Sequence, residues 1–367
     1  IAASVSRTWS RRAAHFTTAF FALCPYHWIF ASSFVKDVTF GTFFALFAAY
    51  MLEFIHFGGL PRRRAAMAVF AGMMACLLRN NMIYAMAVWI VLLLIFGRRT
   101  RRAACLALLV AVLGVGVNQG LAALVQAGGG DAKEMLSVPI QQLCRAYRLV
   151  PECFTESDMV EMDAFFEDQA YTRYDPTLSD PTKNKFATDV FLEDKAAFFA
   201  LWKRIGVQCP QIYLDAFLNT ALPFLYPYQR YQGTAPYIES GVQKGALTMP
   251  FGAPDIVQPR RFEALRTWLD ENIWATGARD FPVLRWVFNA GLVIWLMGLA
   301  VLLAMHRGDW ARFAVLLLPV LLWGTYLLGP VMQGRYLYPF ICMLPLLLAV
   351  PKEGETVGRC PKSGKLA

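Results

Sequence analysis

Residues 98–126 read RRTRRAACLALLVAVLGVGVNQGLAALVQ, a cluster of arginines followed by a long run without a charged side chain. A bilayer core about 30 Å thick requires roughly 17 to 25 apolar residues per helix. The run from Ala103 to Gln126 has this length, so the stretch predicts a transmembrane helix whose basic end lies in the cytoplasm.

Seven further runs are also mostly apolar, and three of them are shorter than 17 residues. The eight predicted spans are Ala13 to Val35, Val38 to Phe57, Ala65 to Leu78, Met82 to Phe96, Ala103 to Gln126, Pro282 to Met305, Ala311 to Leu328 and Tyr336 to Val350. The sequence therefore predicts an all-α polytopic membrane protein.

The charges divide the chain into two parts. Residues 131–281 contain 21 of the 26 acidic residues, whereas the rest of the chain is basic and mostly apolar. Only 17% of all residues are charged, against about a quarter in an average soluble domain. This composition excludes a disordered chain and a small disulfide scaffold, and arginines spread between apolar runs do not resemble a nucleic-acid-binding face, so we expect no nucleic-acid partner.

Every second polar connection between the predicted spans is a basic cluster. The positive-inside rule then places both ends of the chain in the cytoplasm and the acidic middle outside. The predicted organisation is spans 1–5 in residues 1–126, a mainly helical extracytoplasmic domain in 127–281, spans 6–8 in 282–350 and a cytoplasmic tail in 351–367.

Several helices are predicted in the extracytoplasmic domain. A helix after Pro139 has apolar residues on one face, so it either packs within the domain or lies on the membrane. Thr155 with Asp158 predicts a helix start, and Phe191 to Ile205, Pro210 to Leu222 and Arg260 to Trp274 predict three more helices. The predicted extracytoplasmic domain contains Cys144, Cys153 and Cys209. Cys144 and Cys153 are the closest pair in sequence, and they either form a disulfide or remain free thiols.

Three polar tips are predicted to meet at the outer end of the bundle. They are Lys36-Asp37, Arg79-Asn80-Asn81 and Gln333-Gly334-Arg335-Tyr336. Arginine and lysine at membrane depth suit a phosphate, because they offer a bidentate fork and a compact charge. Asp37 is a candidate general base or divalent-cation ligand; the alternative is a plain turn in which it pairs with Lys36. Arg79 alternatively extends to the lipid headgroups.

The order of these features resembles the bacterial GT-C-type polytopic glycosyltransferase-like proteins, and within that group a family without an assigned activity. The stretches that carry the resemblance are Phe34-Val35-Lys36-Asp37, Arg79-Asn80-Asn81, Leu136 to Arg145, Ser179-Asp180-Pro181-Thr182-Lys183, Pro210 to Tyr226 and Gly334-Arg335-Tyr336. The resemblance implies a protein of the bacterial inner membrane that moves a sugar from a polyprenyl-phosphate carrier to a glycan or lipid acceptor, in assembly of the cell envelope.

The resemblance also implies roles for particular residues. We expect Asp37 as the catalytic candidate, with substrate-binding residues at Lys36, Arg79, Asn80, Gln333, Arg335, Tyr336, Gln141, Arg145, Asp180 and Lys183. Similar proteins place a catalytic acid in their first outer loop. Because the sequence opens at Ile1 without Met, we expect that the N-terminal part is missing and that Asp37 orients the acceptor or binds a divalent cation.

Two other classes of function remain open on sequence alone. The same cations suit a transporter or flippase for a lipid-linked or anionic solute, and a membrane-anchored assembly protein would act through its outer domain. The chain has no GxxxxGK[ST], GxGxxG, HExxH or GxSxG motif, so the usual signatures of ATP-driven transport, NAD chemistry and zinc proteolysis are missing.

Overall fold

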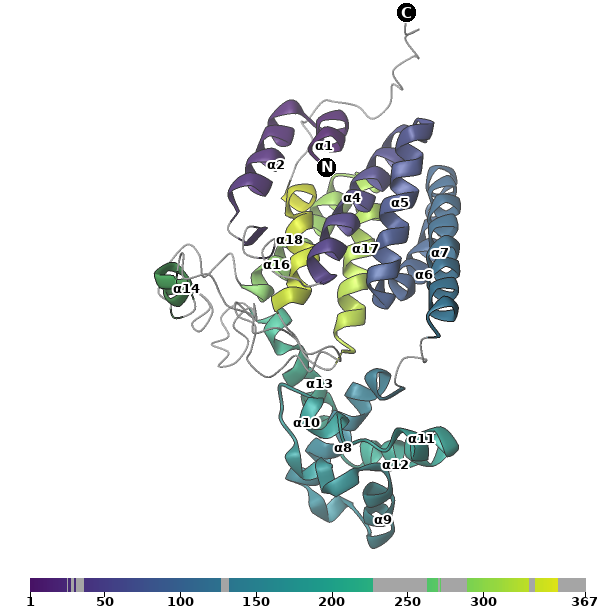
Figure 1. Cartoon of the computed structure of the whole chain (residues 1–367), viewed down its shortest axis with the longest axis vertical. Helices are drawn as coiled ribbons and strands as arrows, with labels where there is room; N and C mark the ends of the chain where they lie inside the picture. Colours follow the sequence, from purple (N-terminus) through teal and green to yellow (C-terminus); the bar gives the residue numbers. More distant parts are fainter. Residues whose placement is uncertain are drawn as a thin grey trace, which may run out of the picture. The chain divides into compact units, whose positions relative to one another are not determined.

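The computed structural model of the chain describes residues 1–24, 26–27, 30, 36–126, 132–226, 263–269, 271, 289–329 and 334–348, and most of them are helical (Figure 1). The β-type pairings among these residues are two isolated bridges, Phe166 to Phe186 and Asp175 to Leu178. The predicted all-α class is therefore confirmed.

The chain divides into two compact units. Unit 1 comprises Ile1–Leu121, Arg230–Leu322 and Gln333–Ala367, and unit 2 comprises Ala122–Gln229 and Trp323–Met332. Helices wholly or mostly in unit 1 are α1 (Ala2–Thr8), α2 (Arg11–Leu23), α4 (Lys36–Phe57), α5 (Arg62–Leu78), α6 (Asn80–Ile95), α7 (Arg98–Leu124), α14 (Glu263–Leu269), α16 (Ala290–His306), α17 (Trp310–Tyr326) and α18 (Gly334–Leu348).

Helix α4 is the central helix of unit 1. It packs against α1, α5 and α18, and it is buried along most of its length. Two glycines allow its neighbours to approach closely. A Cβ atom on Gly41 would lie 2.7 Å from Cδ1 of Tyr338 in α18, and one on Gly72 of α5 would lie 2.8 Å from Cδ2 of Phe47 in α4. The two glycines therefore set how closely α5 and α18 pack against α4.

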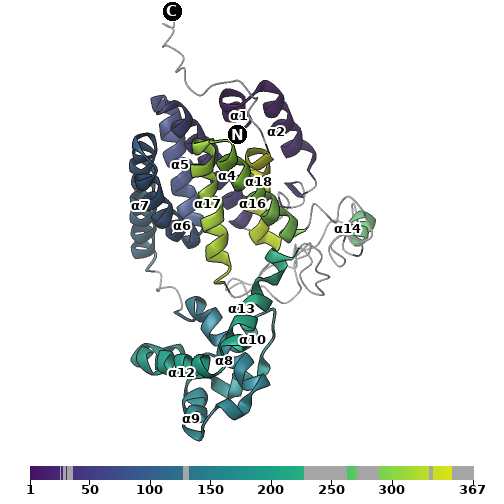
Figure 2. The ribbon, with the colours of Figure 1, turned by 180° about the vertical axis from the view of Figure 1, so that it is seen from behind.

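Two helices in the described part of the chain are long and apolar enough to cross a membrane, at Lys36–Phe57 and Thr100–Leu124. The second lies in α7, at the edge of the bundle in both views (Figures 1 and 2). Its side chains Leu108, Leu109 and Val112 are exposed, and a large exposed apolar surface is typical of a membrane or protein contact. These helices indicate association with a membrane.

The first predicted span differs from the structure. Helix α2 ends at Leu23, inside the predicted run from Ala13 to Val35. Cys24 takes extended backbone angles, φ −67° and ψ 118°, as expected for a residue that precedes a proline. The proline at position 25 thus interrupts the apolar run, and residues 31–35 lie outside the described part.

Unit 2 is built around an aromatic and aliphatic core. Its elements are η1 (Ala132–Leu136), α8 (Ser137–Leu149), η2 (Pro151–Cys153), α9 (Glu156–Phe165), η3 (Glu167–Arg173), α10 (Asp180–Lys183), α11 (Thr188–Glu193), α12 (Lys195–Gln208) and α13 (Pro210–Leu225). Ile140 and Leu143 of α8 are fully buried in this core. The amphipathic helix after Pro139 therefore packs within its own unit, which was the first of the two alternatives.

The helix boundaries of unit 2 show which local sequence signals predicted a helix start correctly. The predicted start at Thr155 is confirmed, because Thr155 and Asp158 form a reciprocal capping box. The single helix predicted from Phe191 to Ile205 is wrong: Asp194 ends α11 and accepts a hydrogen bond of 2.9 Å from the amide of Ala197, so it caps a separate α12. Of the helix predicted from Arg260 to Trp274, the structure describes Glu263–Leu269.

Candidate functional site

The candidate site is centred on a buried carboxylate at the start of α4. Asp37 lies in the first turn of this helix and is 1% exposed. Arg79, the single residue between α5 and α6, donates to Oδ1 of Asp37 from Nε at 2.5 Å and also from Nη2. The one-residue connection holds this arginine in extended backbone between two helices, so the fold fixes where its side chain begins.

A second arginine approaches the same carboxylate from α18. Nε of Arg335 lies 3.8 Å from Oδ2 of Asp37, and the Arg335 side chain is 38% exposed. This Nε atom is buried and has no hydrogen-bond partner among the described residues. A ligand can reach the exposed part of the Arg335 side chain, which is larger than that of Arg79, but not the buried Nε atom.

The ring of Tyr336 contacts the guanidinium groups of both arginines. Cζ of Arg79 lies 4.5 Å from the centroid of its ring, and Cζ of Arg335 lies 5.3 Å from it. An aromatic ring attracts cations within about 6 Å of its centroid. The ring thus favours two like charges near each other, an arrangement that would otherwise be opposed by their repulsion.

The backbone adds to the positive potential at this point. Asp37, Arg79 and Arg335 lie at the N-termini of α4, α6 and α18, respectively. Each helix N-terminus carries a partial positive charge of about half an elementary charge and unsatisfied amide donors. The positive charge of two guanidinium groups and three helix N-termini exceeds the negative charge of the one carboxylate. The cluster of Asp37, Arg79, Arg335 and Tyr336, called the arginine cluster below, therefore suits an anion such as a phosphate.

Other predicted residues lie beside the arginine cluster in sequence. Lys36 and Asn80 are exposed at the first positions of α4 and α6. Lys36 is not the partner of Asp37 that a plain turn would require, because Arg79 has that role. Gln333 lies outside the described residues.

Four predicted substrate-binding residues belong to unit 2 and have partners there. Gln141 donates from Nε2 to the Asp175 carbonyl at 2.9 Å, and Arg145 donates from Nη1 to the Tyr174 hydroxyl at 3.2 Å. Lys183 is buried and pairs with Glu134 at 2.8 Å and with Asp180 at 3.1 Å. These contacts give all four residues a role in holding unit 2 together.

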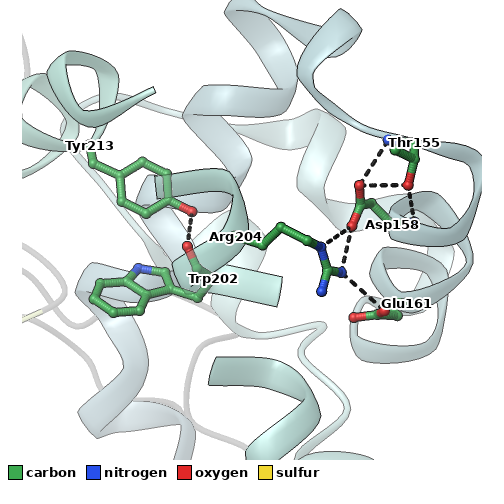
Figure 3. A network of polar contacts seen from close by, with 6 residues as sticks. All are labelled: Thr155, Asp158, Glu161, Trp202, Arg204 and Tyr213. Atoms are coloured by element: carbon green, nitrogen blue, oxygen red, sulfur yellow. Dashed lines mark hydrogen bonds and ion pairs between the residues drawn. The ribbon is translucent and has the colours of Figure 1, made fainter. Parts of the chain in front are cut away.

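The charges of unit 2 are set by such pairs. Burial alone would lower the pKa of Lys183, but its hydrogen bonds with Glu134 and Asp180 raise that pKa above its ordinary value. Burial would raise the pKa of Asp158, but hydrogen bonds from Thr155 and Arg204 bring that pKa below its ordinary value (Figure 3). Lys183 and Asp158 are therefore both charged at neutral pH.

A second buried acid was missed by the sequence reasoning. Glu53, near the other end of α4, is 3% exposed; Arg64 of α5 donates to both its oxygens, and Arg7 of α1 donates to Oε1 at 3.0 Å. The available signal was a lone acid inside an apolar run, which by itself marks a structural or functional partner.

The described residues contain no group of three or more His, Cys, Asp or Glu side chains that could hold a metal ion. Comparison with curated proteins and with solved structures gave no match. A family match extends over residues 4–357, nearly the whole chain, so the protein belongs to the family described as "Family of unknown function (DUF6020)".

Proposed function

We propose that this protein is a glycosyltransferase of the bacterial inner membrane that moves a sugar from a polyprenyl-phosphate carrier to a glycan or lipid acceptor outside the cytoplasm. The observation that carries the proposal is the arginine cluster, a net positive site at three helix N-termini. A carrier phosphate has the charge and the oxygen geometry that two guanidinium groups bind.

The proposed topology has eight spans, with unit 2 outside and both ends of the chain in the cytoplasm. In addition to the two long apolar helices, shorter apolar helices at Asn80–Ile95, Ala290–His306, Trp310–Tyr326 and Arg335–Leu348 support it. The basic clusters at Arg62-Arg63-Arg64 and Arg98 to Arg102 lie at the opposite helix ends from Asp37 and Arg79. In this topology the arginine cluster faces outward, where lipid-linked sugars are used.

In the proposed reaction, an acceptor hydroxyl attacks the anomeric carbon of the sugar. The bond between that carbon and the carrier phosphate breaks, the phosphate leaves with the electron pair, and the hydroxyl proton passes to solvent. Arg335 contributes most directly, because its side chain is 38% exposed and its guanidinium group can donate to the departing phosphate. Arg79 adds positive charge while Asp37 holds it in place. We assign Asp37 this positioning role because Oδ1 is already engaged by Arg79.

The test uses full-length protein in membrane vesicles that receive polyprenyl-phosphate carriers with radiolabelled sugars. Arg79→Ala and Arg335→Ala should each abolish transfer to the acceptor, while the protein remains in the membrane at normal levels. Arg102→Ala is the matched control, because Arg102 is an exposed arginine of α7, and it should transfer sugar normally. Normal transfer by both cluster variants would contradict the proposal.

The same vesicles separate the enzyme from the transporter or flippase. A new glycosidic bond formed without movement of the carrier across the bilayer supports the enzyme. Movement of the lipid-linked sugar without a new bond would contradict the enzyme and support the transporter. In that case the arginine cluster would bind the carrier phosphate during passage.

A further inference from the structure

Two cysteines of unit 2 that are distant in sequence meet in the structure. Cys153 is the last residue of η2, and Cys209 precedes α13 as its N-terminal cap residue. The two thiols are hydrogen-bonded to each other. Cys209 belongs to the hydrophobic core of the unit, and Cys153 packs against that core.

The backbone around both residues is fixed by regular hydrogen bonds. The Cys153 amide donates to the Val150 carbonyl at 3.0 Å, and the Cys209 amide donates to the Ile205 carbonyl at 3.0 Å. In the next turn, the Tyr213 amide donates to the Cys209 carbonyl at 3.3 Å. Both cysteines therefore lie in ordered backbone at the ends of helices.

The third cysteine of unit 2 has a different partner. Cys144 of α8 is completely buried, and its thiol is hydrogen-bonded with Thr182. The structure thus favours Cys209 over Cys144 as the partner of Cys153. Closeness in sequence favoured the opposite choice.

We propose that Cys153 and Cys209 form a disulfide bond in the mature protein, and that Cys144 remains a free thiol. The proposal rests on the extracytoplasmic placement of unit 2 in the proposed function, because structural disulfides persist outside the cytoplasm. The bond would tie η2 to the start of α13 and close the chain between residues 153 and 209.

The oxidant is a disulfide-bearing protein oxidase of that compartment. The thiolate of Cys153 attacks one sulfur of the oxidase disulfide and expels the other as a thiolate, which gives a mixed disulfide. Cys209 then loses its proton and attacks Sγ of Cys153, which expels the second oxidase thiolate. The two cysteines lose two protons and two electrons, and the oxidase disulfide is reduced to two thiols.

Accessibility sets the order of the two attacks. Cys153 is half-buried, whereas Cys209 is 7% exposed. Burial raises the pKa of the Cys209 thiol to about 11, and the neighbouring Cys153 and Glu152 add to the rise. Because the thiolate is the reactive form, Cys153 is the thiol that meets the oxidase first.

The test is a peptide map of the full-length protein from bacterial membranes. Cells are quenched with acid, free thiols are blocked with N-ethylmaleimide, and trypsin digests the protein without reductant. Cys144, Cys153 and Cys209 then lie on three different peptides, 134–145, 149–173 and 205–230. We expect most molecules to give a linked 149–173 and 205–230 pair that disappears on reduction, with peptide 134–145 alkylated.

Two variants provide matched controls. The linked pair should be lost completely in Cys153→Ser and should be unchanged in Cys144→Ser. A linked 134–145 and 149–173 pair in the wild-type protein would overturn the proposed pairing. The wild-type map does not depend on either variant folding.

Three alkylated peptides in the wild-type protein would overturn the native disulfide, and a second step then locates the error. The purified protein is incubated with glutathione disulfide and mapped again. Rapid formation of the 153–209 link would show that the pairing is right and that unit 2 faces a reducing compartment, which would also contradict the proposed topology. Failure to link would show that the pairing is wrong and would leave the proposed function untouched.

Discussion

The two ends of α4 hold the same set of groups in two different arrangements. At each end two arginines lie at a buried acid, Asp37 or Glu53. A tyrosine ring contacts the arginines there, Tyr336 at the Asp37 end and Tyr50, beside Arg64, at the Glu53 end. Both oxygens of Glu53 receive hydrogen bonds from Arg64, and Arg7 adds a third. At Asp37 both of the hydrogen bonds from Arg79 described above go to Oδ1, and Nε of Arg335 lies 3.8 Å from Oδ2.

The difference separates a closed ion pair from an open one. At Glu53 the carboxylate is fully used, so the group joins α1, α4 and α5 and leaves little capacity for a ligand. At Asp37 the buried Nε of Arg335 has no hydrogen-bond partner in the described residues, and more than a third of the Arg335 side chain is exposed. Similar sets of side chains therefore form a structural contact at the Glu53 end of α4 and a candidate anion site at the Asp37 end.

The largest expected effect is on the closed end. Glu53→Gln leaves Arg64 and Arg7 without their carboxylate, and breaking a buried ion pair on one side costs about 3 kcal/mol or more. We expect a loss of about 3 kcal/mol in unfolding free energy, measured by thermal unfolding of the detergent-solubilised protein. Transfer activity per folded molecule should be unchanged.

The double variant Glu53→Gln/Arg64→Gln is the control for this prediction. It removes one of the two unpaired charges, so it should recover part of the lost stability. A stable Glu53→Gln protein that no longer transfers sugar would contradict the distinction between the two ends.

A smaller effect is expected for the matched change at the open end. Asp37→Asn keeps an oxygen that accepts from Arg79 but removes the charge that fixes the arginine. We expect transfer to fall about tenfold, equivalent to about 1.4 kcal/mol in the activation free energy. The loss of stability should be smaller than for Glu53→Gln, because the exposed part of Arg335 retains its contact with solvent. Transfer at the wild-type rate would show that Asp37 does not position the arginines.

The smallest effect is expected for an ion pair in unit 2. Arg204 donates to Asp158 from Nε at 2.7 Å (Figure 3), but the Arg204 side chain is 41% exposed. Solvent screening therefore limits how much the ion pair stabilises unit 2. Arg204→Gln should lower the free energy of unfolding by less than about 1 kcal/mol. Hydrogen exchange of peptides from α9 and α12 in the full-length protein measures the local loss.

The same pair gives unit 2 a pH dependence. The pKa of Asp158 in the folded protein lies below its ordinary value, so the folded state favours the carboxylate. This stabilisation is present above the ordinary pKa of about 3.9 and is lost as the pH falls through the folded pKa. The protection factors of α9 amides, which are exchange rates relative to the intrinsic rate at the same pH, should therefore fall in strong acid, and less so in Asp158→Asn. An equal fall in both proteins would exclude Asp158 as the cause.

The helical class, the apolar runs and the division of charge could be predicted from the amino-acid sequence. These properties are local: apolar periodicity, a capping box at Thr155 and Asp158, and a proline after Cys24 act within a few residues of chain. The end of α11 at Asp194 is also a local feature, but the apolar residues on both sides of Asp194 predicted one continuous helix.

Which charged atoms pair with one another depended on helix packing. The sequence predicted that the tips holding Asp37, Arg79 and Arg335 meet, and the structure engages Asp37 with Arg79 and brings Arg335 within 3.8 Å of Oδ2, where α18 packs closely on α4 at Gly41. The same packing pairs Glu53 with Arg7 and Arg64, and the core of unit 2 brings Cys153 to Cys209 rather than to Cys144. Sequence patterns report the character of each segment, but a pairing between distant side chains depends on how helices pack, and this was settled by close contacts in three dimensions.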